Sequence, residues 1–256
     1  MKQDSRSARP AALDEVMSRG WRALEEEAVD GWVCRFSGGV TKRANSVLPL
    51  GEPADFAAAL AVVEHRYADR GLPAVFQISP DSMPPGLDER LAERGYLLDS
   101  PTLVQYLALA EDTNDGGGDG DPRIEYSDEP SEAWLETLWD AEGPNVPEAQ
   151  SLSRRILAET PSVYASLVFE GRVEAIARLA LVGNLGGIYA VATKADSRSR
   201  GHGRAVVRAL LTEASNRNLE GLWLQVVESN HIAHGLYESL GFETVSRYHY
   251  RVAPPA

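Results

Sequence analysis

The pattern of apolar and polar positions divides the chain into two stretches of predicted helices and strands, separated by a purely polar segment. Residues 111–122 contain no residue of the apolar types and have four glycines, so they cannot contribute to a hydrophobic core. This composition is typical of a flexible linker, which we assign to 113–122. It predicts a first domain at 1–112 and a second at 123–256, each long enough to fold around its own core.

Within the second domain, apolar runs of strand length alternate with segments that have a helical pattern. The predicted strands are 123–126, 163–169, 173–182, 186–193 and 221–227, with a last strand pair after residue 242. The predicted helices are 131–140, 148–158, 204–216 and 230–240, and Ser131 and Asn230 are suitable N-caps. This order predicts an α+β fold, in which a mixed, mostly antiparallel twisted sheet is flanked by helices.

The first domain repeats the closing elements of the second domain. Three of its elements follow one another in the matching order: a helix at 54–67, an apolar run at 72–78 and a strand at 102–109. A glycine is also similarly spaced, because Gly95 follows Gln77 by 18 residues and Gly241 follows Gln225 by 16. The sequence therefore predicts two related α+β units in tandem.

The chain is strongly acidic, with 25 Lys and Arg against 38 Asp and Glu and a formal net charge of −13. This balance argues against a nucleic-acid partner, which requires a broad cationic surface. The sequence has no run of 18 or more apolar residues that would predict a membrane span, and its first residues lack the apolar segment of a signal peptide. We therefore expect a cytoplasmic protein without membrane contact.

A single cysteine, Cys34, allows no internal disulfide, which suits a reducing compartment. It lies in the apolar run 31–36, where we expect a packed strand residue rather than a nucleophile. No cluster of His, Cys and Asp residues has the spacing of metal ligands, so we predict no metal site.

A glycine-containing loop follows the predicted strand at 186–193 and leads into the next helix. Residues 198–203 have the pattern Arg-x-x-Gly-x-Gly, and between Lys194 and Arg208 there are five cations and one acid. Backbone N–H groups without intrahelical partners gather there at the positive end of the helix dipole, and the glycines let an anion approach closely. This arrangement favours a phosphate or pyrophosphate ligand; the alternative is a solvated, cationic helix start.

A second motif follows after 26 residues and reads Asn230-x-x-Ala233-x-x-Leu236-Tyr237-x-x-Leu240-Gly241-Phe242. The two motifs, separated by one helix and one strand, resemble those of the GNAT superfamily of acetyl-CoA-dependent N-acetyltransferases. The resemblance covers roughly residues 121–252. It implies a GNAT fold, in which the strands at 186–193 and 221–227 are parallel neighbours that splay apart. Together with the repeat, it implies two GNAT-like domains, of which the first is degenerate.

The resemblance also implies acetyl-CoA as cosubstrate and gives specific residues a role in binding it. Backbone groups of Val191 and Thr193 match those that pair with the pantetheine amides. The loop residues match the pyrophosphate cradle; they are Arg198, Ser199, Arg200, Gly201, His202, Gly203 and Arg204. Asn230 and Ala233 match contacts to the CoA arm, and Asn230 is equally well explained as a helix N-cap.

Tyr237 matches the general acid of the family, a phenol near the sulfur that protonates the departing thiolate. Its alternative role is apolar packing on the helix. The attacking amine must also lose a proton to a carboxylate or a histidine. Glu228, at the end of a predicted strand, is the first candidate for this base, and Glu142 is the second. His231 and His234 are further candidates, which are more simply explained as structural residues.

The first domain lacks the anion loop. Residues 50–55, at the corresponding position, have one glycine, two carboxylates, no cation and a proline that removes an N–H donor. We therefore expect one CoA per chain, and we expect residues 1–112 to fold alone without binding CoA. The polar segment 41–47 either lines the acceptor side of the second domain, with Arg43 and Asn45 as reaching groups, or forms a hairpin with a solvated face.

These inferences predict an N-acetyltransferase that transfers the acetyl group of acetyl-CoA to a primary amine by direct nucleophilic attack. A small-molecule amine is favoured, and the net negative charge mildly favours a cationic or neutral one. The alternative is a non-catalytic module that binds CoA or acetyl-CoA as a sensor or interaction partner. The identity of the acceptor and the oligomeric state are left open by the sequence.

Overall fold

The computed structural model describes residues 13–109, 121–143 and 146–254. Its helices in these ranges are α1 (Leu13–Gly20), α2 (Phe56–Ala68), α3 (Leu87–Glu93), α4 (Glu132–Glu142), α5 (Pro147–Ala158), α6 (His202–Asn216) and α7 (His231–Glu238), with short 3₁₀ turns η1 (Lys42–Ala44) and η2 (Ala195–Ser197). None of the helices in the described ranges is both long and apolar enough to cross a membrane.

The strands are β1 (Glu25–Val29), β2 (Trp32–Phe36), β3 (Val47–Pro49), β4 (Val75–Ile78), β5 (Leu97–Ala108), β6 (Ile124–Ser127), β7 (Ser162–Phe169), β8 (Arg172–Val182), β9 (Leu185–Thr193), β10 (Gly221–Val227) and β11 (Glu243–Val252). Each element predicted between residues 123 and 242 is present, with its ends shifted by at most two residues.

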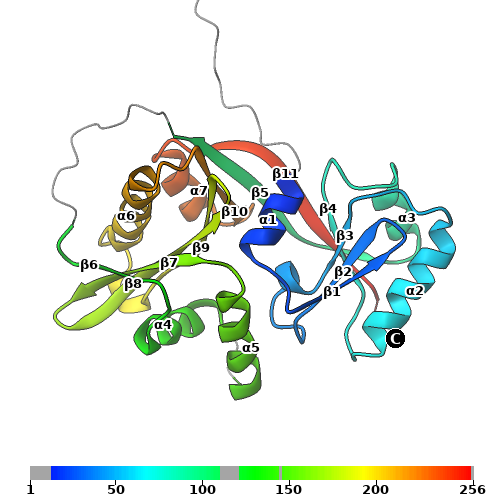
Figure 1. Ribbon diagram of the computed structural model, residues 1–256, viewed down its shortest axis with the longest axis horizontal. Coiled ribbons are helices and arrows are strands. Elements are labelled where there is room, and N and C mark those ends of the chain that lie inside the picture. The colour runs from blue at the N-terminus through cyan, green and yellow to red at the C-terminus, as the bar shows by residue number, and fades with distance from the viewer. Residues whose placement is uncertain (1–12, 110–120, 144–145, 255–256) are drawn as a thin grey trace, which may run out of the picture.

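All these strands form one mixed sheet in the order β1-β2-β3-β4-β11-β5-β10-β9-β8-β7-β6 (Figure 1). Two pairs of neighbours, β3 with β4 and β9 with β10, are parallel, and the other described pairs are antiparallel. The predicted α+β class is confirmed. The sheets expected for the two halves of the chain are joined into a single sheet.

The two halves exchange their last strands. β11, which ends the second half, lies between β4 and β5 and pairs antiparallel with both. β5, which ends the first half, lies in turn between β11 and β10. The last strand pair predicted for the second half is therefore wrong, because the described residues after 242 form the single strand β11.

The pairing pattern repeats between the two halves. In the first half, β1–β2 and β2–β3 are antiparallel and β3–β4 is parallel. In the second half, β7–β8 and β8–β9 are antiparallel and β9–β10 is parallel. A helix follows the third strand of each series, and a shorter helix precedes each exchanged strand. This order supports the predicted internal repeat.

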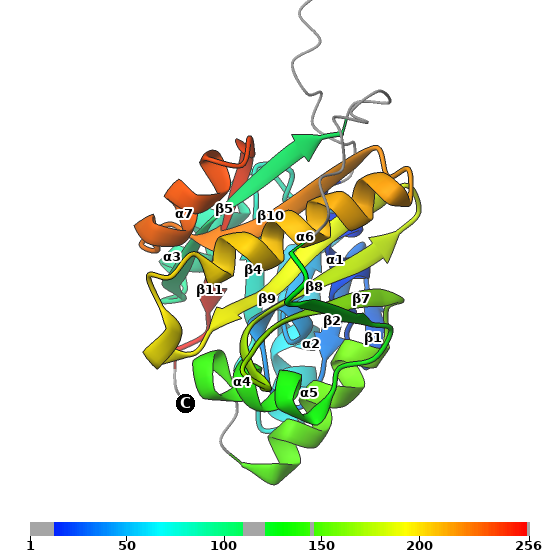
Figure 2. The same ribbon diagram turned by 90° about the vertical axis from the view of Figure 1, so that its left-hand side faces the viewer.

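Helices cover both faces of the sheet in the second half. Along β8, Ala175, Ala177 and Leu179 belong to a core with α6, whereas Ile176 and Ala180 belong to a core with α1, α4 and α5. This alternation is the period of two expected for a strand buried on both faces. Figure 2 shows α6 crossing one face of the sheet. α1 comes from the first half, yet it packs on β8 and β9 between the two halves (Figure 1).

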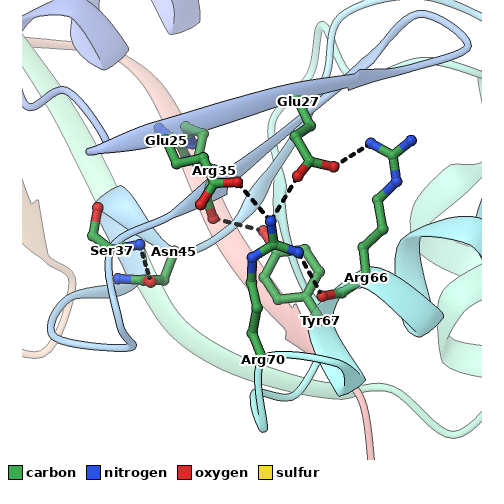
Figure 3. A network of polar contacts seen from close by, with 8 residues as sticks. All are labelled: Glu25, Glu27, Arg35, Ser37, Asn45, Arg66, Tyr67 and Arg70. Atoms are coloured by element: carbon green, nitrogen blue, oxygen red, sulfur yellow. Dashed lines mark hydrogen bonds and ion pairs between the residues drawn. The ribbon is translucent and has the colours of Figure 1, made fainter.

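A network of polar contacts fixes α2 to the first hairpin (Figure 3). Arg70, in the turn that follows α2, lies 2.6 Å from carboxylate oxygens of both Glu25 and Glu27 on β1. The Tyr67 hydroxyl donates a hydrogen bond of 3.0 Å to the backbone carbonyl of Arg35 on β2. These contacts tie the outer face of the first half together.

Cys34 lies beneath α2 in the core of the first half and is fully buried. Burial raises the pKa of its thiol to about 11, so the thiolate that a nucleophile requires is disfavoured. The prediction that Cys34 is a packed strand residue is confirmed.

Candidate active site

β9 and β10 run side by side at their starts and then separate. Their parallel pairing joins Leu185–Ile188 to Gly221–Leu224, and no further pair follows within the described ranges. Each strand continues along its other neighbour, β9 on β8 as far as Thr193 and β10 on β5 as far as Val227. The result is a fork in the sheet, whose inner edges carry backbone N–H and C=O groups that the ladder does not use. The predicted separation of these two strands is confirmed.

The closed end of the fork is tightly packed. A Cβ added to Gly187 would lie 2.5 Å from ring carbons of both Tyr189 and Trp223, so only glycine fits there. The Trp223 indole N–H donates a hydrogen bond of 3.0 Å to the Tyr189 hydroxyl, which donates one of 3.1 Å to the Met17 carbonyl of α1. The fork is thereby anchored to a helix of the first half.

A bulge lies on β9 where the fork opens. Arg178 pairs with Tyr189 and Ile176 with Ala192, so Ala190 and its successor together face a single residue of β8. Ala190 has a φ of 52°, a left-handed conformation that costs an L-residue about 1–2 kcal/mol. A bulge turns nearby backbone groups out of the ladder. An alanine gives no sequence signal for such a conformation, so the bulge was missed.

The predicted anion loop leads directly into α6. Gly201 is the N-cap with a φ of 79°, and it supplies no side-chain oxygen to the first N–H groups of the helix. Ser199 is also left-handed, with a φ of 60°. A Cβ added to Gly203 would lie 3.3 Å from Thr193 Oγ1 at the end of β9, which shows how closely the loop and the fork approach. His202 is 6% exposed, and its Nδ1 has no hydrogen-bond partner among the described residues.

The corresponding helix of the first half is already capped. Asp55 is the N-cap of α2, and its carboxylate accepts hydrogen bonds from the N–H groups of Ala57 and Ala58, at 2.9 and 3.1 Å. Asp30 accepts a third, of 2.7 Å, from the N–H of Ala54. The carboxylates of the chain thus occupy the place where an external anion would bind, whereas the N-terminus of α6 remains available.

Two side-chain contacts hold the loop in position. The Ser197 hydroxyl, just before the loop, donates to the carboxylate of Glu174 on β8, which is 6% exposed. On the other side, Arg204 Nη1 donates a hydrogen bond of 2.9 Å to the hydroxyl of Ser239 at the end of α7. The second contact brings the two sequence motifs together across the opening of the fork.

The second motif forms α7. Asn230 is its N-cap, and the Asn230 side-chain oxygen accepts a hydrogen bond of 3.1 Å from the N–H of Ala233. The capping role is therefore confirmed. Ala233 is half-buried, and Tyr237, one turn further, is 7% exposed with its ring centroid 6.1 Å from that of Phe242. Tyr237 thus packs in the core on the α6 and α7 face.

The candidate bases differ in their surroundings. Glu228 is exposed, and its N–H donates a hydrogen bond of 2.8 Å to the carbonyl of Pro101 on β5. His234 lies 3.5 Å from a carboxylate oxygen of Glu238, whereas His231 is exposed. The side chain of Glu142 lies outside the described residues. Among the residues that the structure describes, no group of three or more His, Cys, Asp or Glu could hold a metal ion.

A pair of charges from the first half, which sequence reasoning missed, lies near the strand edge that carries Glu228. Lys42 Nζ donates to the carboxylate of Asp99 and, at 3.1 Å, to the hydroxyl of Ser100 on β5. The hydrogen bond from Lys42, followed by the one that the Ser100 hydroxyl donates to the same carboxylate, lowers the pKa of Asp99 and keeps it ionised. Pro101 follows Ser100 directly, and its carbonyl accepts the hydrogen bond from the Glu228 N–H. The pairing of β5 with β10 therefore brings the Lys42–Asp99 pair to the same edge of the fork as Glu228.

The segment 41–47 is largely buried, so the interpretation as a hairpin with a solvated face is wrong. Ser46 and Val47 are fully buried, and Asn45 is 5% exposed. The Asn45 side chain accepts hydrogen bonds from the N–H groups of Ser37 (Figure 3) and Gly39 and donates one to the carbonyl of Thr41. Asn45 therefore does not reach into the second half, because its side-chain amide is hydrogen-bonded to the backbone of its own loop.

Arg43 borders a small cavity together with Gln225 of β10, and its guanidinium lies 5.7 Å from the ring centroid of Trp21. Its role at the acceptor side stays a prediction. The neighbouring loop also approaches α5, since a Cβ added to Gly38 would lie 2.6 Å from Leu152. The first half thus contacts the second on the face opposite α6 and α7.

A mixed sheet that forks between two parallel strands, with a glycine loop and an uncapped helix beside the fork, defines an N-acetyltransferase of the GNAT type, an acyltransferase. The chain belongs to the family described as "Probable histone acetyltransferase Rv0428c C-terminal", whose model matches residues 8–251.

Individual relatives agree with this assignment. The chain is 29% identical over 247 residues to "Uncharacterized N-acetyltransferase YobR" of Bacillus subtilis, covering 94% of this chain and 97% of that protein. A "GCN5-related N-acetyltransferase from Kribbella flavida" has a similar structure, with a TM-score of 0.67, 15% identity and 96% of each chain covered. A "Tandem GNAT protein from the clavulanic acid biosynthesis pathway (without AcCoA)" gives a TM-score of 0.58 at 14% identity, covering 98% of this chain and 90% of that one. At these identities the two structures support the fold.

Proposed function

We propose that this enzyme transfers the acetyl group of acetyl-CoA to a primary amine on a small molecule by direct nucleophilic attack. In this proposal, residues 123–256 form the catalytic domain, 113–122 the linker, and 1–112 a degenerate domain without a cofactor site. The observation that carries it is the uncapped, cation-flanked N-terminus of α6 beside the fork, which contrasts with the carboxylate-capped N-terminus of α2.

The loop suits the pyrophosphate of acetyl-CoA, the acyl donor that GNAT enzymes generally use. The N–H groups from Arg198 to Arg204 include those of the first turn of α6, where the dipole favours an anion. Arg198 and Arg200 are exposed and have no carboxylate partner among the described residues, so they can contact an anion from outside the loop. A Cβ at Gly203 would lie only 3.3 Å from Thr193 Oγ1, so glycine keeps the cradle open.

The inner edge of β9 suits the pantetheine arm. From the bulge at Ala190 to Thr193, backbone groups on this edge are not used by β10 within the described ranges. The amides of the arm can pair with Val191 and Thr193 as an added strand would. Asn230 and Ala233 flank the arm on the α7 side, where the side-chain N–H₂ group of Asn230 is a donor that the cap does not require.

Acetyl-CoA supplies an activated acyl group. Residues of the chain take the proton from the attacking amine and give one to the departing thiolate. We assign Tyr237 as the general acid, because a phenol can donate a proton and its position matches that of the motif. We assign Glu228 as the base, since an exposed carboxylate at the end of β10 can receive the amine proton directly or through water. The single buried cysteine and the acidic charge support a cytoplasmic enzyme with no nucleic-acid partner.

Calorimetric titration with acetyl-CoA tests the cofactor site. We expect one site per chain, and we expect Gly203→Trp to abolish binding because the indole fills the loop. Arg198→Gln with Arg200→Gln should weaken binding about tenfold or more, since hydrogen bonds to charged groups contribute roughly 1.5–3 kcal/mol. The double variant Arg90→Gln with Arg94→Gln on α3 changes the net charge equally and should bind normally. Normal binding by Gly203→Trp, or two equivalent sites, would refute the assignment.

A second assay tests catalysis. Release of free CoA is followed with a thiol-reactive dye in the presence of a panel of amines. Tyr237→Phe should lower kcat by roughly 10²–10⁴, the usual contribution of a positioned proton donor. Tight binding of acetyl-CoA without thiol release for any amine would instead favour the non-catalytic binding module.

A further inference from the structure

The polar segment 41–47 of the first half holds the backbone of Lys42 in a fixed place. The Lys42 carbonyl accepts a hydrogen bond of 3.1 Å from the N–H of Asn45 and one of 2.7 Å from the hydroxyl of Ser46. Asn45 and Ser46 are themselves buried. The side chain of Lys42 therefore starts from a well-anchored turn, so its ammonium group can hold another segment in position.

The ammonium group of Lys42 contacts the start of β5. Its Nζ donates a hydrogen bond of 2.5 Å to the carboxylate of Asp99 and one of 3.1 Å to the hydroxyl of Ser100. The Ser100 hydroxyl in turn donates to the Asp99 carboxylate. Lys42 also lies over Tyr250 of β11, with Nζ 5.6 Å from the ring centroid. The cation thus connects η1 with both of the exchanged strands.

Ser100 has a strained backbone at the point that Lys42 holds. Its φ is 48°, a left-handed conformation that is unfavourable for an L-residue, and a residue before proline favours an extended conformation instead. The pairing register with β11 shifts between Tyr248 and Tyr250, so Ser100 and Pro101 together face a single residue of that strand. Such bulges re-aim neighbouring groups, and strained residues persist only where the surrounding structure enforces them.

The bulge of β5 also fixes the end of β10. The ladder between these strands ends with Val227 opposite Thr102. One residue further, the N–H of Glu228 donates a hydrogen bond of 2.8 Å to the carbonyl of Pro101, inside the bulge. The direction in which the Glu228 side chain leaves the strand therefore depends on where the bulge places Pro101.

We propose that Lys42 is a positioning residue for acetyl transfer, which holds the bulge of β5 through Asp99 and Ser100 and thereby aims Glu228 at the amine. Lys42 touches neither substrate and acts through Glu228. This inference rests on the proposed function, in which Glu228 is the base. It gives the first half a part in the reaction that requires no cofactor site of its own, and it gives the segment 41–47 a role.

The alternative is an ordinary surface ion pair. The side chains of Lys42 and Asp99 are 39% and 41% exposed, and pairs of this kind contribute little to stability. Loss of the pair should therefore change the Tm little. Its effect on the rate should be much larger, because a displacement of about 1 Å at a reacting group can lower a rate about 10²-fold. This contrast between rate and stability separates the two explanations.

Steady-state kinetics on the full chain test the proposal. Release of CoA is measured with spermidine, phenethylamine and alaninamide, and the amine that is turned over fastest is used for the variants. Lys42→Met should lower kcat about tenfold or more. The Kd for acetyl-CoA, measured by calorimetry, should stay unchanged, because the variant leaves the loop before α6 intact.

Three further variants separate positioning from a general loss of structure. Lys42→Arg should retain most of kcat, because a guanidinium also binds the Asp99 carboxylate. Lys42→Met combined with Ser100→Gly should recover part of the lost rate, since glycine adopts the left-handed conformation without support. Arg66→Met is the matched control and should leave kcat unchanged. It removes an ion pair of similar exposure with Glu27 on β1, at the far edge of the sheet.

Amide hydrogen exchange tests the positioning step without any turnover. The Glu228 N–H is hydrogen-bonded to the bulge, so it should exchange at least tenfold faster in Lys42→Met than in the native chain. The amide of Leu224, inside the ladder with β5, should exchange at the native rate in both proteins.

The outcomes separate this inference from the proposed function. Native kcat or native exchange at Glu228 in Lys42→Met would overturn the inference and leave the acetyltransferase proposal intact. Equal losses of kcat and of acetyl-CoA affinity would overturn it too, because Lys42 would then support the fold in general. If the native chain binds acetyl-CoA but turns over no amine, the result counts against the proposed function, and exchange at Glu228 then decides whether Lys42 holds the bulge.

Discussion

Removal of β11 would test the exchange of strands between the two halves. We consider the chain cut after residue 112, with 1–112 and 113–256 produced separately. The first piece would lack the strand that lies between β4 and β5, and the second would lack the strand that lies between β10 and β11. Both pieces would therefore have a gap inside the sheet rather than a shorter edge.

The magnitude follows from the side chains that β11 buries. Tyr248 and Tyr250 are each 3% exposed, and both belong to the core between the halves. Two such aromatic side chains bury roughly 200 Å² each, which corresponds to roughly 10 kcal/mol in total at about 25 cal/mol per Å². A domain is typically stable by only about 5–15 kcal/mol. Loss of this strand alone can thus unfold the first half.

We therefore expect the opposite of what the sequence suggested for residues 1–112. Neither piece alone should show a cooperative urea transition by circular dichroism, whereas the two pieces produced together should form a 1:1 complex that unfolds in one transition. Tyr250→Ala in the intact chain should lower stability by about 3–5 kcal/mol, as for other large core truncations, and both halves should unfold together. Phe169→Ala, at an aromatic residue that is 43% exposed, is the control. Cooperative unfolding of 1–112 alone would refute the reasoning.

Three further predictions concern single residues. Gly187→Ala places a Cβ 2.5 Å from the ring of Trp223, and we expect overpacking to cost roughly 1–3 kcal/mol in urea unfolding; an unchanged midpoint would contradict the packing at the closed end of the fork. Cys34 should not react with a disulfide reagent at pH 8 until the protein is denatured, because burial raises its pKa to about 11; rapid labelling of the native protein would show that the thiol is accessible. Asp88 accepts hydrogen bonds from Arg251 and His249, which lower its pKa, so its stabilisation is present above the unfolded-state pKa of about 3.9 and is lost as the pH falls through the lower folded value. Asp88→Asn should consequently lower the Tm at pH 7, with a difference from the native protein that narrows below pH 4; a difference independent of pH would argue against the ion pair.

The uncapped start of α6 could be predicted because its determinants are local. Glycines at 201 and 203, a run of cations and a following amphipathic segment suffice to indicate a helix that begins without a side-chain cap, and α6 begins at residue 202. The different start of α2 could be predicted for the same reason, since Asp55 places a carboxylate at its N-cap.

The contacts between the two halves could not be predicted in the same way. Arg43 and Gln225 lie 182 positions apart in the sequence, yet they border one small cavity. Asn45 was a reasonable candidate for a reaching group, yet its amide forms hydrogen bonds within its own loop. Whether a polar side chain points outward or closes a turn depends on the surrounding backbone, which the residue type does not reveal.

By itself, the sequence determined the helices and strands between residues 123 and 242, the repeated order of the two halves and the glycine loop that leads into α6. Each of these depends on periodicity, capping and glycine placement among residues close together in the chain. The tertiary structure alone decided that β5 and β11 change places, that Ala190 forms a bulge at the fork and that the guanidiniums of Arg35 and Arg178 are buried. These features depend on which strand edges meet and on how the sheet buries its faces, and such contacts between distant residues leave no local pattern in the chain.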